Sequence, residues 1–335
     1  MRDTQLDTYR SLCMMYIVCI IHSVYWLGFG KEPFKSLILI EMPVIFFISG
    51  ASLSQGKSSK GYLSTLKNRI KRVMLPYYIY AVATVAFIAL MTLCGKVPSM
   101  DITAYNYKDI IKILLSIDIP QSPFCWHLWF IIPYMILSCI FVFHQSMLHK
   151  VKPIFYLAIN ILIFILTQTI TGNYLIRHIF CYNIFMLAGY CFYKQLNKKQ
   201  IICILLSVLA YIITAHYVTG SRLTPMQSHK FPADTIFLCY TTFALCALSL
   251  LFSCIRLPYK GILTIWNKRG YTIYLYQNIV IFAISLVIPH LYEYTKYDII
   301  TGGLAVALIF TVSTLLSCIT YPIEQRIISK IKLFN

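Results

Sequence analysis

Ionisable side chains occur inside long apolar stretches of this sequence. The first stretch, LDTYRSLCMMYIVCIIHSVYWLGF (6–29), carries Arg10 near its start and His22 deep inside, and the second carries Glu41. On insertion scales a charged group at the centre of a bilayer costs roughly 2.5–3.5 kcal/mol, so such groups tend to be functional. A histidine, an arginine and a carboxylate that face one polar cavity are suited to acid–base chemistry or to a path for a polar substrate.

These residues also have structural interpretations. Arg10, near a helix end, can reach the lipid headgroups with its long side chain. A single buried histidine such as His22 can be a hydrogen-bonded core residue. Further polar residues at membrane depth favour a polar cavity over these structural interpretations. They are His127 and two consecutive residues, Gln277 and Asn278. We therefore expect all of them to face a common polar cavity rather than lipid.

Ten apolar segments must position these side chains. Of the 335 residues, 59% are hydrophobic and 12% are charged, and the mean hydropathy is +0.72. About 20 apolar residues in a row can span a bilayer as a helix. The sequence thus predicts an all-α, polytopic membrane helical bundle that forms a single domain over residues 1–335. The expected spans are about 8–28, 36–55, 73–94, 126–144, 153–171, 178–194, 201–218, 233–254, 271–290 and 299–321.

The basic residues indicate the direction of these spans. With an even number of spans both termini lie on the same side, and cytoplasmic termini place 20 of the 29 Lys and Arg residues inside and 9 outside. This asymmetry follows the positive-inside rule. The same clusters account for the net charge of +18, so the charge gives no support to nucleic-acid binding. The twelve cysteines include no Cys-x-x-Cys pair, so neither a metal site nor a disulfide framework is indicated.

Six segments of the sequence carry motifs in a fixed order. They are LDTYRSLCMMYIVCIIH (6–22), MPVIFFISG (42–50), RIKRVMLPYYIY (69–80), HLWF (127–130), KFPADTIFL (230–238) and YTIYLYQNIVIF (271–282). These motifs resemble, in type and in order, those of the integral-membrane acyltransferase 3 family, which includes bacterial polysaccharide O-acetyltransferases. The resemblance covers essentially the full length.

The sequence departs from the family pattern at three places. The family usually has ten residues between the arginine and the histidine of the first span, whereas this chain has eleven. Twelve positions on an ideal helix leave two residues about 120° apart, while eleven return to within about 20°. Either Arg10 is not the partner of His22, or a π-bulge absorbs the extra residue. Gln277 stands where the family commonly has histidine, and Ala233 replaces the second proline of a Lys-Phe-Pro-Pro segment.

The resemblance implies transfer of an acetyl group from cytoplasmic acetyl-CoA to a hydroxyl of a cell-surface polysaccharide or its lipid-linked precursor. It also implies a multi-pass protein of the bacterial inner (cytoplasmic) membrane, with no metal. A sugar hydroxyl is a poor nucleophile near neutral pH and needs a base within about 2.6–3.2 Å. His22 is the expected base. Glu41 would orient His22 or hold its imidazolium, and Arg10 would bind either the thioester carbonyl or a phosphate of coenzyme A.

The remaining site residues follow from the same resemblance. Arg69, Lys71 and Arg72 begin the third span, where guanidinium groups suit the phosphates of acetyl-CoA; anchoring of the topology is the alternative. His127 and Trp129 are expected to line the outer half of the cavity, although an interfacial tryptophan can also be an anchor. The expected cavity also includes Ser49, a hydroxyl nucleophile without an evident adjacent base, and Gln277.

Two other functions belong to different classes. A polysaccharide exporter or flippase would move the glycan without consuming acetyl-CoA, and it leaves the arginine and histidine of the first span unexplained. A non-catalytic scaffold is disfavoured because the intramembrane ionisable groups would then bring only a cost. The expected partners are therefore membrane lipid, a glycan acceptor and acetyl-CoA.

Overall fold

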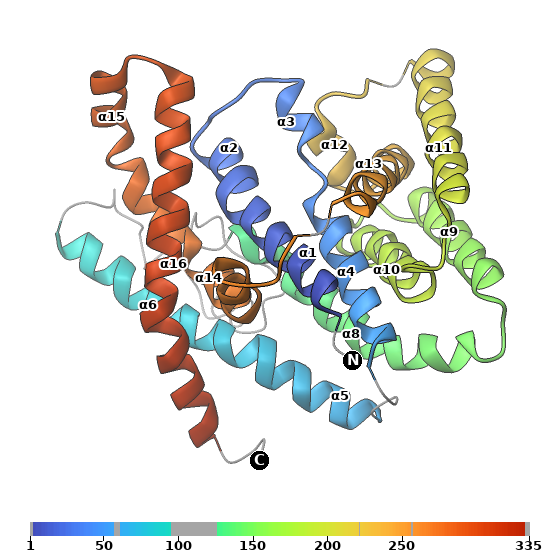
Figure 1. Cartoon of the computed structure of the whole chain (residues 1–335), viewed down its shortest axis with the longest axis horizontal. Helices are drawn as coiled ribbons and strands as arrows, with labels where there is room; N and C mark the ends of the chain where they lie inside the picture. Colours follow the sequence, from blue (N-terminus) through green and yellow to red (C-terminus); the bar gives the residue numbers. More distant parts are fainter. Residues whose placement is uncertain (1–2, 57–60, 95–125, 221, 256, 332–335) are drawn as a thin grey trace. The chain divides into compact units, whose positions relative to one another are not determined.

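The described part of the chain is helical. The computed structural model describes residues 3–56, 61–94, 126–220, 222–255 and 257–331 (Figure 1). These residues form helices and one isolated bridge between Lys230 and Ala233, with no β-strand among them. The expected all-α fold is thereby confirmed. The chain divides into two compact units, of which unit 1 comprises Met1–Ser59 and Phe143–Asn267, and unit 2 comprises Lys60–Val142 and Lys268–Asn335.

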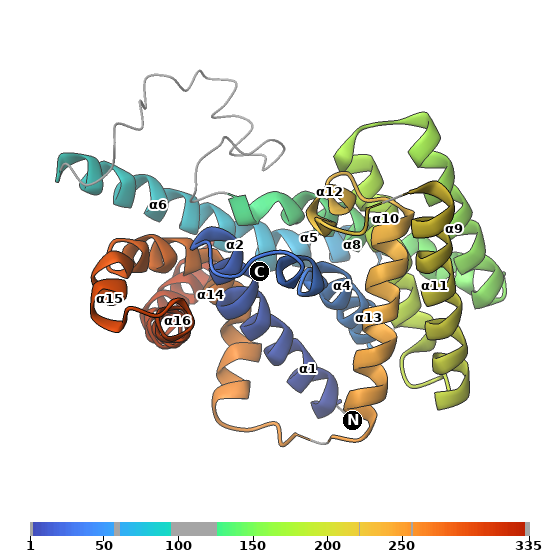
Figure 2. The same cartoon turned by 90° about the horizontal axis from the view of Figure 1, so that it is seen from above.

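Unit 1 starts with three consecutive helical segments. They are α1 (Thr4–Met15), the π-helix η1 (Tyr16–Ile21) and α2 (His22–Trp26). The side chain of Asp3 caps α1 by accepting hydrogen bonds from the N–H groups of Gln5 and Leu6. The other helices that lie wholly in unit 1 are α3 (Phe34–Leu37), α4 (Glu41–Ser54), α9 (Pro153–Ile170), α10 (Tyr174–Phe192), α11 (Lys198–Thr219), α12 (Met226–Lys230) and α13 (Thr235–Ser253). Within this unit α11 and α13 run side by side (Figure 2).

Unit 2 surrounds a core rich in tyrosine. Tyr77 and Tyr80 pack with Leu128, Leu275 and Tyr276 in this core. The boundary between the units falls within two helices, α8 (Ile131–Leu148) and α14 (Ile262–Ser285). The remaining elements of unit 2 are α5 (Tyr62–Arg69), the π-helix η2 (Ile70–Met74), α6 (Leu75–Leu93), the 3₁₀-helix η4 (Trp126–Phe130), α15 (Ile288–Thr295) and α16 (Asp298–Lys330).

Seven helical segments among the described residues are long and apolar enough to cross a membrane. They are Phe34–Ser54, His127–Leu148, Pro153–Ile170, Tyr174–Phe192, Lys198–Val218, Thr235–Ser253 and Asp298–Lys330. The three other predicted spans, at about 8–28, 73–94 and 271–290, are also largely helical. The chain is thus a helical membrane protein with several spans, while the number ten and the cytoplasmic termini stay predictions.

Two glycines bring α4 and α10 into backbone contact. A Cβ atom added at Gly50 would lie 1.8 Å from the carbonyl oxygen of Met186, and one added at Gly189 would lie 2.0 Å from that of Phe47. Helices in membranes use small residues to approach this closely. The Gly50 that ends the MPVIFFISG motif is therefore required by packing.

Candidate active site

A π-helix separates Arg10 from His22. The N–H of His22 donates to the carbonyl oxygen of Ile17, five residues earlier, at the end of η1. This spacing defines a π-helix, which accommodates an extra residue within an α-helical run. Once one residue is absorbed, the twelve positions from Arg10 to His22 leave the two side chains about 20° apart instead of about 120°. Of the two alternatives that the spacing left open, the structure contains the π-helix.

Three side chains of unit 1 hold the guanidinium of Arg10. Nη1 donates to Oδ1 of Asp7 at 3.4 Å and to Oδ1 of Asn267 at 3.3 Å, and Nη2 donates to Oγ of Ser52. The side chain of Arg10 is still 34% exposed. Three of its five N–H groups are used in this way, and the other two make no hydrogen bond with a described residue. The guanidinium is thus oriented by the protein and retains donors for a ligand.

The imidazole of His22 is buried and held in one plane. His22 is 8% exposed at the start of α2. Its ring stacks on the indole of Trp26, with the ring centroids 4.0 Å apart and the planes at 7°. Trp26 follows four positions later, so the two side chains lie on the same face of the helix. The stack fixes the plane that contains both ring nitrogens.

Glu41 is paired with Lys230. The Nζ of Lys230, on α12, donates to Oε1 of Glu41 at the start of α4, and each side chain is 5% exposed. The other oxygen of Glu41, Oε2, accepts no hydrogen bond from a described residue. The expected pair between Glu41 and His22 is therefore not formed within the described residues. The physical reason is that an ammonium neutralises a buried carboxylate, whereas a neutral imidazole does not.

The surroundings of Lys230 could not be predicted from the sequence. Nε2 of His178, a residue that is 0% exposed, donates to the carbonyl oxygen of Lys230 at 2.8 Å. The Nζ of Lys230 also lies 5.3 Å from the ring centroid of Phe231. The His178 ring stacks on Tyr182 with an interplanar angle of 4°. The sequence indicates the importance of this region only through the KFPADTIFL motif (230–238). Lys230 begins this motif, but no partner was predicted for it.

His229, the residue before Lys230, makes two further polar contacts. Its Nδ1 lies 2.6 Å from Oδ2 of Asp234, and its Nε2 lies 2.6 Å from the carbonyl oxygen of Arg222. Both partners are acceptors, so the two bonds together require an imidazolium. The hydrogen bond with Asp234 raises the pKa of His229, against the effect of partial burial. Oδ1 of Asp234 caps α13 by accepting from the N–H of Phe237 at 2.9 Å.

The hydroxyl of Ser49 is bonded to its own helix. It donates to the carbonyl oxygen of Ile45, four residues earlier on α4, at 2.8 Å. A serine in the middle of a helix commonly makes this bond. Within the described residues, the hydroxyl of Ser49 thus donates to a backbone carbonyl and not to a base.

His127 is locked as a neutral imidazole in unit 2. Nδ1 of His127 faces the amide nitrogen of Asn278 at 2.7 Å, and its Nε2 faces the carbonyl oxygen of Leu275 at 3.1 Å. An amide N–H₂ only donates and a carbonyl only accepts, so the proton of the ring is on Nε2. The hydroxyl of Tyr274 donates to the backbone carbonyl of His127, which is 1% exposed. These contacts join η4 to α14.

The residues expected to line one cavity are divided between the two units. Gln277, on α14, is 0% exposed, and Trp129, in η4, is half-buried. Both belong to unit 2 together with His127, whereas Ser49 belongs to unit 1 with Arg10 and His22. The structure thus joins His127 with Asn278, and places Arg10 and His22 on one side of the first helix.

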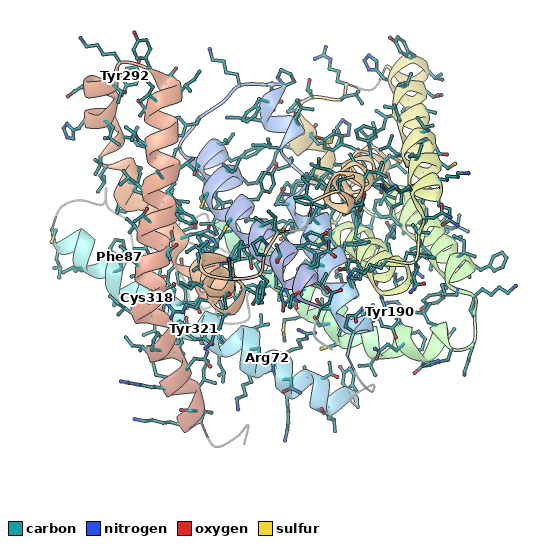
Figure 3. All side chains as sticks on the ribbon, in the orientation of Figure 1. Arg72, Phe87, Tyr190, Tyr292, Cys318 and Tyr321 are labelled. Atoms are coloured by element: carbon teal, nitrogen blue, oxygen red, sulfur yellow. The ribbon has the colours of Figure 1, made fainter. Side chains whose placement is uncertain are left out.

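The basic residues of the RIKR motif lie directly before and within the second π-helix, η2. Arg69 ends α5, and its Nη1 donates to the hydroxyl of Tyr134 at 3.0 Å, with the guanidinium 5.4 Å from that ring centroid. Lys71 and Arg72 lie within η2. Arg69 and Lys71 are half-buried. Arg72, which is labelled in Figure 3, is exposed. Guanidinium and ammonium groups so close together suit a ligand that carries several phosphates.

Comparison with known proteins identifies the family. Residues 3–321 match the family model described as an acyltransferase domain, Acyl_transf_3. Comparisons with curated proteins and with solved structures gave no match. The matched region covers nearly the whole chain and includes all the candidate site residues described above. The chain therefore belongs to the acyltransferase 3 family, whose members are membrane-embedded acyltransferases.

Proposed function

We propose that the protein is a membrane O-acyltransferase of the bacterial inner membrane. It moves an acetyl group from cytoplasmic acetyl-CoA to a hydroxyl of a cell-surface polysaccharide or its lipid-linked precursor. Family membership supports acyl transfer. The observation that carries the proposal is η1, because this π-helix gives Arg10 and His22 a common side despite the unusual spacing.

His22 acts as the general base in this proposal. The imidazole takes the proton of the acceptor hydroxyl while the oxygen attacks the thioester carbonyl, and the carbon–sulfur bond then breaks to release the thiolate. A base in this role contributes typically 10²–10⁴-fold to the rate. The two remaining N–H groups of Arg10 either bind the carbonyl oxygen, as in an oxyanion hole, or bind a phosphate of the donor.

Arg69, Arg72 and Lys71 bind the phosphates of acetyl-CoA. The contact between Arg69 and Tyr134 supports this role, because it orients a half-buried guanidinium that would otherwise be mobile. The measurement is equilibrium binding of acetyl-CoA to the purified protein in nanodiscs. Arg69→Ala should weaken this binding at least tenfold, while Arg326→Ala, which removes an exposed arginine of α16, should not. Equal affinity for both variants would rule out the phosphate role.

The O-acetyl content of the envelope polysaccharide tests the function as a whole. We would measure it by proton NMR in the wild type, in a deletion strain, and in that strain complemented with His22→Ala. His216→Ala is the matched control, because His216 is an exposed histidine of α11. The proposal expects the acetyl signal to be lost in the deletion, restored by His216→Ala and not restored by His22→Ala. Unchanged acetylation per sugar with less polymer at the surface would instead establish an exporter.

A further inference from the structure

Two glutamates of the described chain are buried, and they differ in their partners. Glu41 is 4% exposed and is paired with the ammonium of Lys230. Glu324, near the end of α16, is 1% exposed and forms no ion pair among the described residues. A buried carboxylate without a cation is far more costly than one with a cation. The two glutamates therefore call for different protonation states.

Among the described residues, the contacts of Glu324 involve no positive charge. Its Oε2 accepts a hydrogen bond from the hydroxyl of Thr272 at 2.6 Å, and its Oε1 accepts none from a described residue. Glu324 interacts electrostatically with Tyr271 and Tyr276, both on α14. A phenol hydroxyl cannot neutralise a carboxylate.

The basic residues on α14 and α16 make their contacts with groups other than the carboxyl group of Glu324. Lys268 and Arg269 lie over the ring of Tyr321, at 6.0 and 5.8 Å from its centroid, and Nη1 of Arg269 donates to Sγ of Cys318 at 2.9 Å. Figure 3 marks Cys318 and Tyr321 on α16. Arg326 is exposed and stands two positions after Glu324, so its side chain leaves the helix on another face.

We propose that Glu324 is a proton-binding site, in which the side chain is a neutral carboxylic acid at pH 7. Oε2 accepts from Thr272, and Oε1 carries an exchangeable proton. Buried carboxyl groups of this kind are the elements of proton relays in membrane proteins. The inference goes beyond acyl transfer, because it concerns a residue to which the proposed reaction gives no role.

Isotope-edited infrared spectroscopy tests the protonation of this carboxyl group directly. The chain has only four glutamates, Glu32, Glu41, Glu293 and Glu324. The protein would be made by cell-free synthesis into nanodiscs, with glutamate labelled with ¹³C at its side-chain carboxyl group. The label shifts the infrared carboxyl bands of the glutamates and leaves those of the aspartates unchanged. At pH 7 we expect one carbonyl band of a protonated acid that shifts with the label and in D₂O. It should disappear in Glu324→Gln and persist in Glu41→Gln, where the removed carboxylate was paired.

The outcomes are separable from those of the activity test. If all four glutamates absorb as carboxylates at pH 7, or if the acid band persists in Glu324→Gln, the proposal is wrong whether or not the protein acetylates a glycan. Should Glu324→Gln fail to accumulate, Thr272→Val gives the same information with the carboxyl group in place. Removal of the hydrogen bond from Thr272 should then move the acid band, and an unmoved band would contradict the assignment.

Discussion

The side chains of Lys230 and Glu41 lie 189 positions apart in the chain and form an ion pair in which each is 5% exposed. A second ion pair of unit 1 offers a comparison. The Nζ of Lys194 lies 2.7 Å from Oδ2 of Asp3, but the Lys194 side chain is 50% exposed. Solvent screens the second pair and hardly reaches the first, so the two pairs should differ widely in their effect on stability.

Removal of one partner of the buried pair should be strongly destabilising. Lys230→Met leaves a buried carboxylate without its cation, and we expect a loss of about 3–5 kcal/mol of unfolding free energy. The additional change Glu41→Gln should recover part of this loss, since it removes the unpaired charge. The measurement is thermal unfolding of the purified protein in detergent.

The exposed pair provides the control for that measurement. Lys194→Met should cost no more than about 1 kcal/mol. A loss of similar size in Lys194→Met and Lys230→Met would mean that the pair between Lys230 and Glu41 is screened by solvent and carries no special cost. A double variant as unstable as Lys230→Met would show that the charge left behind is not the cause.

The packing of α4 on α10 predicts two intolerant glycines. Gly50→Ala and Gly189→Ala would each force a Cβ into a backbone carbonyl group, which cannot move as a side chain can. We expect each variant to lose about 1–3 kcal/mol or more. Gly303→Ala, on α16, is the control: a Cβ added there meets nothing within 4 Å, and alanine is the better helix former. Unchanged melting of Gly50→Ala would disprove the close approach.

His229 should make stability depend on pH. Its hydrogen bond with Asp234 raises the pKa of the folded state above the ordinary value of 6.5. The folded state therefore binds the proton more tightly than the unfolded state, so the contribution is fully present below pH 6.5 and is lost as pH rises through the raised pKa. His229→Gln should flatten the dependence of the melting temperature on pH in that window. A wild-type curve that does not fall there would exclude the imidazolium.

The sequence predicted the helical class, and it reduced the spacing of Arg10 and His22 to two alternatives, a π-bulge or no partnership, because both predictions follow from spacing along one chain. A mismatch of one residue between Arg10 and His22 can be recognised without a structure. The partner of Glu41 could not be predicted in this way. The packing of α12 in unit 1 brings Lys230 to Glu41. Hydropathy places His22 and Glu41 at a similar depth, but it does not indicate which positively charged side chain lies next to Glu41. Contacts between distant segments depend on packing, which local patterns do not encode.

The tautomer of His127 can be observed directly. Its contacts with Asn278 and Leu275 require the proton on Nε2. We expect the ¹⁵N spectrum of histidine-labelled protein to contain a ring with this tautomer, assigned to His127 by its change in Asn278→Leu, across the range of pH in which exposed histidines titrate. Asn278→Leu removes the donor to Nδ1 and should change the shift of that nitrogen alone. A signal for this ring that titrates with the exposed histidines would contradict its burial.

The π-helix η1 predicts opposite effects of deleting and of inserting one residue. Because η1 already holds one residue more than a regular α-helix, deletion of Ile20, a half-buried member of it, should convert the segment to α-helix. Arg10 and His22 would then be eleven positions apart and still within about 20° of each other, so acetylation should be retained. Insertion of one alanine after Ile17 would turn His22 by about a further 100°, and a misplaced base should lower acetylation about 10²-fold or more. The O-acetyl content of cells that produce each variant at equal levels checks both outcomes. Loss of acetylation in the deletion variant, with the insertion variant active, would show that the common side of Arg10 and His22 has no part in the reaction.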